Sequence, residues 1–361
     1  MAVLGNLIEQ VRGVSYKPED LHTALNENSV TLLRANNIKD GKINFDDVVY
    51  VDRKKVSEKQ LLKAGDILIC ASSGSKELVG KAAYVESDLQ MTFGAFCKVV
   101  RPKTDCPQYI GHFFNSPYYR ERIANFAAGA NINNIRNEHI DILEIAWPSM
   151  EKQCSAVTVL DKVTELIALR KEQLAKLDRL VKSRFVELFY GKGYPTLKWN
   201  EVFNTTTGKL DSNAMVEDGE YPFFTCAKEV FRIDKYAFDQ EALLLAGNNA
   251  AGKYDVKYYK GKFNAYQRTY VLGLKEDWSY QLFRYQLEDK LVYLQQQSLG
   301  GLTKYLTLKI LGELEFIVPP MDKQNEFTAF VEQTDKSKLA IQQSLDKLEL
   351  LKKSLMQEYF G

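Results

Sequence analysis

Two long stretches of the chain show helical patterns of apolar and polar residues. In the first, Leu160, Ile167, Leu174, Val181 and Leu188 recur every seven residues, with further apolar residues between them. This spacing is typical of a helix that packs along another helix. We predict helical segments over 148–192 and 319–361, each with a helix of nearly forty residues, roughly 55–60 Å long at about 1.5 Å per residue. The predicted helix-pair contacts are Leu160, Ile167, Leu174, Leu177, Val181, Leu345, Leu348 and Leu355.

The two predicted helices belong to an internal repeat. The segment WPSMEKQ at 147–153 recurs as PPMDKQ at 319–324, so Pro148 matches Pro319, and the same shift continues through both helices. The prolines suit a first helical turn, and Gly191 suits the end of the first helix. Each helix therefore has the other copy as its natural partner. A plain dimerisation coiled coil remains an alternative for these segments taken alone.

The segments before the helices share an order of elements. Residues 61–85 and 238–272 each predict an apolar strand, a polar loop and a second strand. We expect globular domains over 1–147 and 193–318. Because the two globular parts differ in sequence while the helices repeat, the two domains should recognise different things.

The composition describes an ordinary soluble protein. The chain has 361 residues, which predicts at least two domains, and a net charge of +1, so any nucleic acid must meet locally basic surface. We expect a cytoplasmic location, because we find neither a signal segment nor an apolar run that could cross a membrane. The five cysteines include no CxxC pair, and the three histidines have no metal-ligand spacing.

Residues 247–253, GNNAAGK, match most of a phosphate-binding P-loop. That motif needs a Ser or Thr next and a helix behind it, whereas here Tyr254 follows and the next residues predict strands. We therefore interpret this loop as part of the second globular domain. Asn115-Ser-Pro-Tyr-Tyr119 is similar to an adenine methyltransferase loop but has Ser116 in place of a proline, and a helix start explains it better.

The whole chain resembles the specificity subunit of type I restriction-modification systems. The resemblance rests on the two Pro-x-Met-[Glu/Asp]-Lys-Gln helix starts, on the alternation of variable and repeated segments, and on the L-x-x-G-D-I-L-I pattern at 62–69. It implies an α+β fold, with two target recognition domains of mixed β-structure separated by two long helices that form an antiparallel coiled coil.

The resemblance also implies a function without catalysis in this chain. Each recognition domain would read half of a bipartite site in double-stranded DNA, and the helices would hold methyltransferase subunits, two of them. Those partners would bring S-adenosylmethionine. A restriction subunit, where one is present, would bring ATP and magnesium. A coiled-coil scaffold whose globular domains bind proteins is the alternative, and salt dependence of DNA binding separates the two.

Candidate DNA contacts in the second domain follow from a local excess of basic residues around 253–268, interleaved with tyrosines. Lysines can neutralise phosphates, and Asn, Gln and Arg can read base edges in the major groove. The alternative is a solvated hairpin. The candidates are Asn248, Asn249, Lys253, Tyr254, Lys257, Lys260, Gln267, Arg268 and, in the loop before the last strand, Thr303, Lys304 and Tyr305.

The first domain offers candidates in three corresponding places. One is the segment LLRANNIKDGKI, where the Asn pair can alternatively form a turn. The others are the polar loop after the apolar strand and the loop 129–136. The candidates are Arg34, Asn36, Asn37, Ser72, Ser73, Ser75, Lys76, Lys81, Asn131, Asn133 and Arg136.

Overall fold

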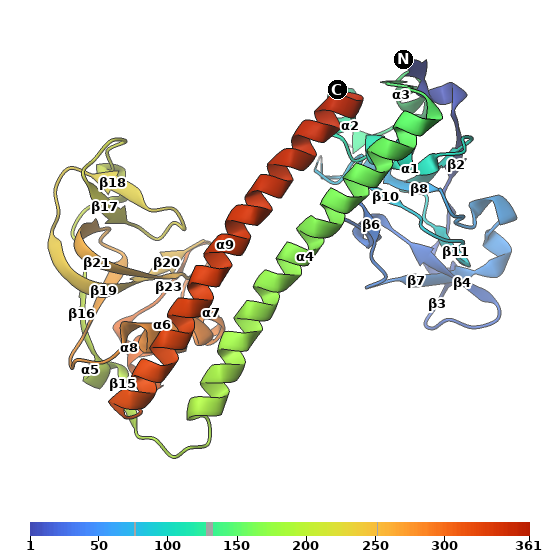
Figure 1. Ribbon diagram of the computed structural model, residues 1–361. Helices are drawn as coiled ribbons and strands as arrows, with labels where there is room; N and C mark the ends of the chain where they lie inside the picture. The colour runs from blue at the N-terminus through green and yellow to red at the C-terminus, as the bar shows by residue number, and fades with distance from the viewer. Residues whose placement is uncertain (76, 128–132, 251) are drawn as a thin grey trace. The chain divides into compact units, whose positions relative to one another are not determined.

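The chain folds into two compact units. The computed structural model describes residues 1–75, 77–127, 133–250 and 252–361 (Figure 1). Unit 1 contains residues 1–172 and 342–361, and unit 2 contains residues 173–341. Both boundaries fall inside the long helices, so these units differ from the segments expected from the sequence. The end of each long helix belongs to the unit that contains the start of the other.

Unit 1 is built on two four-stranded sheets. Their strand orders are β10-β8-β12-β2 and β11-β4-β7-β3, and only the β11–β4 pair among these is parallel. Both β4 and β8 are buried along their whole length, which suits the apolar sequence of β8, whereas β4 also buries Ser29 and Thr31. The strands of unit 1 are β1 (Ala2–Val3), β2 (Ile8–Arg12), β3 (Leu21–His22), β4 (Ser29–Leu33), β5 (Ile38–Lys39), β6 (Lys42–Ile43), β7 (Val49–Asp52), β8 (Ile67–Cys70), β9 (Ser72–Ser73), β10 (Ala82–Tyr84), β11 (Met91–Phe93), β12 (Cys97–Pro102), β13 (Asn133–Asn134) and β14 (Glu144–Ile145).

Short helices and the C-terminal end of the chain close the unit 1 core. The short helices are α1 (Pro107–Phe113), α2 (Pro117–Ala127) and α3 (Asn137–Asp141). The ring of Phe360 packs on Tyr109 of α1, with ring centroids 4.9 Å apart, and also on Phe113. Leu160 and Met356 lie in the same buried cluster. The last turn of the chain is therefore part of the first unit's core.

Unit 2 is built on one six-stranded sheet in the order β16-β22-β19-β21-β17-β18. Residues 242–246 of its central strand β19 are fully buried. The strands are β15 (Thr196–Lys198), β16 (Phe203–Thr207), β17 (Tyr221–Phe224), β18 (Phe231–Ile233), β19 (Phe238–Ala246), β20 (Asn248–Asn249), β21 (Val256–Ala265), β22 (Thr269–Leu274), β23 (Lys304–Tyr305) and β24 (Glu315–Ile317). The short helices are α5 (Trp199–Val202), α6 (Tyr280–Asp289), α7 (Leu291–Gln297) and α8 (Leu308–Gly312). Mixed sheets and segregated helices confirm the predicted α+β class.

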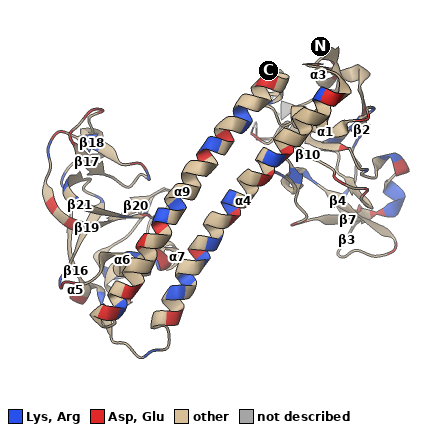
Figure 2. Cartoon of the chain, viewed as in Figure 1, with Lys and Arg blue, Asp and Glu red and all other residues tan. Residues whose placement is uncertain are grey.

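The long helices are α4 (Met150–Phe189) and α9 (Met321–Phe360). Within each unit they run antiparallel, and basic and acidic residues alternate along both (Figure 2). In unit 1, Lys171 of α4 pairs with Glu349 of α9 at 2.9 Å. In unit 2, Lys338 of α9 pairs with Asp178 of α4 at 2.6 Å.

The predicted helix-pair contacts differ in how deeply they are buried. The buried ones are Leu160, Ile167, Val181 and Leu345. The other four, Leu174, Leu177, Leu348 and Leu355, are only half-buried. Aromatic residues add to the packing in unit 2, where Phe185 and Phe189 of α4 lie against Phe327 of α9. The heptad pattern thus located the contact stripe but missed these rings.

The repeated Pro-x-Met-x-Lys-Gln motif has the same geometry in both copies. The side-chain amide of Gln153 donates to the Pro148 carbonyl at 2.9 Å, and that of Gln324 donates to the Pro319 carbonyl at 2.9 Å. Both glutamines are buried. The prediction that the prolines occupy the first turn is wrong, because each lies two residues before its helix begins. The buried glutamine instead fastens the preceding chain to the helix.

Candidate nucleic-acid interface

In each unit, two candidate loops that are far apart in sequence are joined by a two-residue β-ladder. In unit 1, Ser72 and Ser73 of β9 pair with Asn134 and Asn133 of β13. In unit 2, Asn248 and Asn249 of β20 pair with Tyr305 and Lys304 of β23. We call these the paired loops of each unit. The sequence predicted the four loops separately, and the ladders bring them together.

A tight turn adjoins the paired loops at the same place in both units. In unit 1, the turn 94–97 is closed by the Cys97 N–H donating to the Gly94 carbonyl, and the Phe96 carbonyl accepts from the N–H groups of Ala71 and Ser72. In unit 2, the turn 266–269 closes likewise, and the Arg268 carbonyl accepts from Gly247 at 2.8 Å. Arg268 and Phe96 therefore occupy equivalent positions.

The backbone of residues 247–250 and 252–254 shows whether this segment can be a P-loop. Asn248 and Asn249 lie in a strand, Gly252 has φ +66°, and β21 follows Tyr254. A phosphate-cradling loop would need a helix that begins here. This part of unit 2 is therefore a β-hairpin connection, as the sequence predicted.

The candidates of unit 2 divide by their surroundings. Gln267 and Arg268 are exposed at the tip of the adjoining turn, and the Arg268 guanidinium forms no ion pair with the described residues. Lys253 is exposed beside the paired loops, with its N–H donating to the Asn249 side chain. Thr303 and Tyr305 are exposed and Lys304 is half-buried. These residues form a surface in which cationic and amide side chains lie beside the β20–β23 ladder.

Two candidates of unit 2 lie inside the domain. Tyr254 is buried in the main core cluster, so the expectation that its side chain contacts a ligand is wrong. Burial also raises the pKa of the Tyr254 phenol. Lys257 has a side chain only 14% exposed, and its ammonium donates to Asp255 and to the Ala227 carbonyl. We interpret Lys257 as part of the fold.

Lys260 lies farther along β21 and is held by a carboxylate. Its ammonium pairs with Glu241 at 3.0 Å, and the hydrogen bond to Glu241 raises the pKa of Lys260. The same carboxylate accepts from the Tyr258 hydroxyl. The Lys260 side chain is largely exposed, so its ion pair with Glu241 is open to solvent and contributes little to stability.

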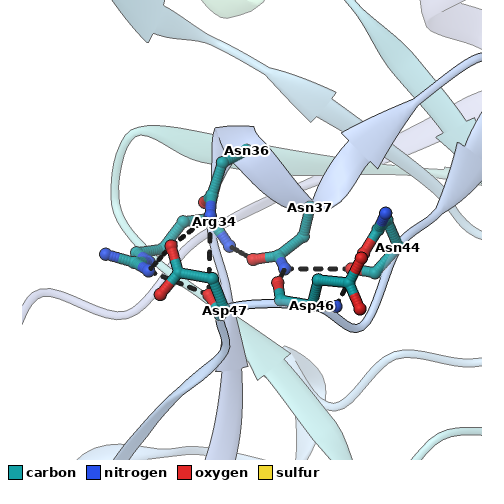
Figure 3. Close-up of polar contacts among 6 residues, drawn as sticks. All are labelled: Arg34, Asn36, Asn37, Asn44, Asp46 and Asp47. Carbon is teal, nitrogen blue, oxygen red and sulfur yellow. Dashed lines mark hydrogen bonds and ion pairs between the residues drawn. The ribbon is translucent and has the colours of Figure 1, made fainter. Parts of the chain in front are cut away.

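In unit 1, the segment after β4 forms a hydrogen-bonded cluster around Asp47 (Figure 3). The guanidinium of Arg34 pairs with the Asp47 carboxylate at 3.0 Å, and the amide of Asn36 donates to the same carboxylate at 2.8 Å. Asn36 is exposed and Arg34 half-buried. Asn36 lies in a short 3-10 helix over Ala35–Asn37, and Arg34 is the residue that precedes this helix.

Asn37 lies beneath this cluster and serves the backbone. It is fully buried, accepts from the Arg34 N–H and donates to the carbonyls of Asn44 and Asp46. All of its hydrogen-bonding capacity except one lone pair of the amide oxygen is therefore used by the loop. The expectation of a ligand contact at Asn37 is wrong, and the alternative, a turn-forming asparagine, is confirmed.

The remaining candidates of unit 1 have mixed surroundings. Ser72 and Ser73 are half-buried in the ladder, Ser75 and Lys81 are exposed, and Arg136 is exposed and pairs with Glu138 at 3.3 Å. Lys76 and Asn131 lie outside the described residues, and only the backbone of Asn133 is placed.

Sequence reasoning missed Phe96. This side chain is 72% exposed although it is a phenylalanine. A constant repeat shift would match Phe96 with Gln267, whereas the hydrogen bonds match it with Arg268. Aligning the two turns by their preceding buried strands would have found this correspondence.

No described helix is both long and apolar enough for a membrane span. The described His, Cys, Asp and Glu side chains include no group of three that could hold a metal ion.

The two units contain equivalent loop ladders, and each includes part of both long helices, so the fold defines a protein with a duplicated domain. The chain belongs to the type I restriction modification DNA specificity domain family, whose model matches residues 20–179 and 192–351. The chain is 39% identical over 173 residues to the type I restriction enzyme StySPI specificity subunit of Salmonella potsdam, covering 48% of this chain and 37% of that protein.

Two further comparisons, one of sequence and one of fold, agree with this family. Identity to the EcoKI specificity subunit of Escherichia coli (strain K12) is 36% over 203 residues, covering 55% of this chain and 44% of that protein. The chain thus matches less than half the length of these two relatives. The type I S subunit from M. genitalium has the same fold, with a TM-score of 0.65, 15% identity and coverage of 100% of this chain and 95% of that one.

Proposed function

We propose that this chain is the DNA sequence-specificity subunit of a type I restriction-modification complex. Each unit would read one half of a bipartite site in double-stranded DNA, with its paired loops and adjoining turn against the base edges. The chain itself would perform no catalysis, in keeping with the specificity subunits that it resembles.

One observation carries the proposal. The same backbone hydrogen bonds join the loops and the turn in both units, yet the side chains on them differ: serines and Phe96 in unit 1, asparagines and Arg268 in unit 2. A conserved frame with unlike polar groups suits two readers of different sequences, because donor and acceptor patterns in the major groove distinguish base pairs. Lys253 and Lys81 would add contacts to phosphates.

The long helices would hold the partner subunits. Exposed leucines on them, Leu180 on α4 and Leu339 and Leu350 on α9, offer apolar contacts, and Leu339 and Leu350 are 60% and 69% exposed. We expect two methyltransferase subunits, which would bring S-adenosylmethionine. A restriction subunit, if it joins, would bring ATP and magnesium.

Selection of bound duplexes from a random pool tests the proposal. The full chain is used alone and with the methyltransferase subunits of its own host. Enrichment of a two-part motif with a fixed gap is the expected result, and Arg268→Ala should relax only one part. One unbroken motif would refute the two-reader arrangement. No enrichment in either sample would favour a protein scaffold.

A further inference from the structure

Phe96 is an apolar side chain with no structural task in the domain. It is 72% exposed at the tip of the turn 94–97. Its ring belongs to no hydrophobic cluster and stacks on no aromatic ring among the described residues. Large apolar side chains usually lie inside, since burial removes their surface from water. Here the exposed ring is held at a fixed place by its own backbone.

The backbone of Phe96 fixes the ring beside the paired loops. Its carbonyl accepts from Ala71 at 2.9 Å and from Ser72 at 3.0 Å, and the Ala71 carbonyl in turn accepts from Ile135 behind β13. The ring is thus anchored to both loops of the ladder. A side chain on such a support is placed more accurately than one on a free loop.

Unit 2 has a cation at the equivalent place. The Arg268 carbonyl accepts from Gly247, and the Gly247 carbonyl accepts from Leu306 behind β23, which repeats the unit 1 pattern. Arginine at a base-reading position pairs with guanine through two hydrogen bonds. A phenyl ring can form neither. The only apolar group on the base edges of the major groove is the C5 methyl of thymine.

We infer that Phe96 is a specificity-determining residue of unit 1 that packs against a thymine methyl group, at the place where Arg268 contacts its base in unit 2. The inference rests on the proposed function. Flanking groups fit this placement: the Ser72 and Ser73 hydroxyls can bond either type of base, and the exposed Lys81 lies one residue before β10, which pairs with β8.

Replacement of thymine by uracil tests this contact, because it removes the methyl group and nothing else. The full chain with the methyltransferase subunits of its host is bound to its selected duplex. The half-site that Arg268→Ala leaves unchanged is assigned to unit 1. Each thymine of that half-site is then replaced singly by uracil. The loss of one buried methyl group predicts about fourfold weaker binding at one position.

Variants of the protein localise the effect. Phe96→Ala should bind the thymine duplex about tenfold more weakly and should no longer distinguish uracil from thymine. Phe96→Leu, which keeps an apolar side chain, should retain part of the discrimination. Leu25→Ala is the matched control: Leu25 is 60% exposed in the same unit but precedes β4, at the opposite end of that strand from Arg34. It should retain the full fourfold effect.

Several results would overturn the inference while DNA recognition stands. These are a unit 1 half-site of G·C pairs alone, equal binding of all uracil duplexes by the parent, and unchanged discrimination by Phe96→Ala. A rise in 2-aminopurine fluorescence within the half-site that the parent shows and Phe96→Ala lacks would also overturn it, because base flipping by the methyltransferase subunits does not need this ring and the rise would indicate insertion of the ring between base steps. Failure of the parent to prefer any duplex would refute the proposed function as well.

Discussion

Gln324 holds the chain before α9 through the hydrogen bond from its side-chain amide to the Pro319 carbonyl, at 2.9 Å. Its amide oxygen also accepts from the Ser279 N–H at 3.0 Å, so the same side chain ties the start of α6 to α9. In unit 1, Gln153 repeats the first bond, but its amide oxygen has no partner among the described residues. The two copies of the motif therefore differ in what they support.

We predict that Gln324→Leu destabilises unit 2 by about 2–3 kcal/mol, because it leaves the buried Pro319 carbonyl and the half-buried Ser279 N–H unpaired. Gln153→Leu should cost unit 1 about 1–2 kcal/mol. Urea unfolding followed by hydrogen exchange of peptides from each unit measures both. Gln333→Leu, on an exposed position of α9 in unit 2, is the control. Equal costs for the two buried glutamines would contradict the asymmetry.

Asn37 and Asn36 should contribute very differently to the stability of unit 1. Asn37→Ala should destabilise unit 1 by about 2–3 kcal/mol, because the Arg34 N–H and two carbonyls lose their partner. Asn36→Ala removes an exposed hydrogen bond to Asp47 and should change stability by less than about 0.5 kcal/mol. Thermal unfolding of both variants checks this. A stable Asn37→Ala variant would refute the assignment of Asn37 to the fold.

Lys253 should act on DNA of every sequence alike. Lys253→Glu is expected to weaken binding to all duplexes and to reduce the slope of log affinity against log salt by about 1, since one phosphate contact is lost. Titration at several salt concentrations measures the slope. Lys235→Glu is the control, because Lys235 is exposed before the other end of β19. An unchanged slope for Lys253→Glu would remove this lysine from the interface.

Lys98 should give unit 1 a pH dependence. Burial lowers the pKa of Lys98 to about 8, although its ammonium donates to Gln10 and Asn137. The unfolded chain keeps its proton up to the ordinary pKa of 10.5. Between these values the unfolded state binds more protons, so this group makes unit 1 more stable as pH rises.

The gain should be about 1–2 kcal/mol between pH 8 and 10. Burial raises the pKa of the Cys70 and Cys97 thiols, which act in the opposite direction as pH rises. Lys98→Met isolates the lysine, because the thiols are unchanged in it. The free energy of unfolding of the parent minus that of the variant should increase with pH. A constant difference would contradict the low pKa.

The long helices, the internal repeat and the four candidate loops were predictable because each is a local pattern. For Tyr254, a local pattern predicts a buried side chain and not the surface contact that was expected. Gly252, Tyr254 and Val256 are all buried while Lys253 is exposed, so the alternation typical of a strand begins before β21. The basic residues nearby suggested a surface, but the period of two places this tyrosine in the core.

Other features could not be predicted from local sequence. The ladders β9–β13 and β20–β23 join residues that are about sixty positions apart, and each consists of only two residue pairs. Asn37 is distinguished from Asn36 only by the tertiary positions of Asn44 and Asp46. The role that we infer for Phe96 depends on the hydrogen bonds that its backbone carbonyl accepts from Ala71 and Ser72. Long-range pairing leaves no periodic signal in a single chain.

The packing of Phe360 and Met356 into unit 1 has a consequence for synthesis of the protein on the ribosome. Domains generally fold in the order in which they are made, the N-terminal one first. Here the N-terminal domain lacks part of its core until Met356 and Phe360, which belong to the same buried cluster as Leu160, have left the ribosome. Residues 173–341 are complete earlier. Of the two units, the one that is begun first is therefore the one that finishes folding last, and a chain that stops before residue 342 cannot present two finished domains.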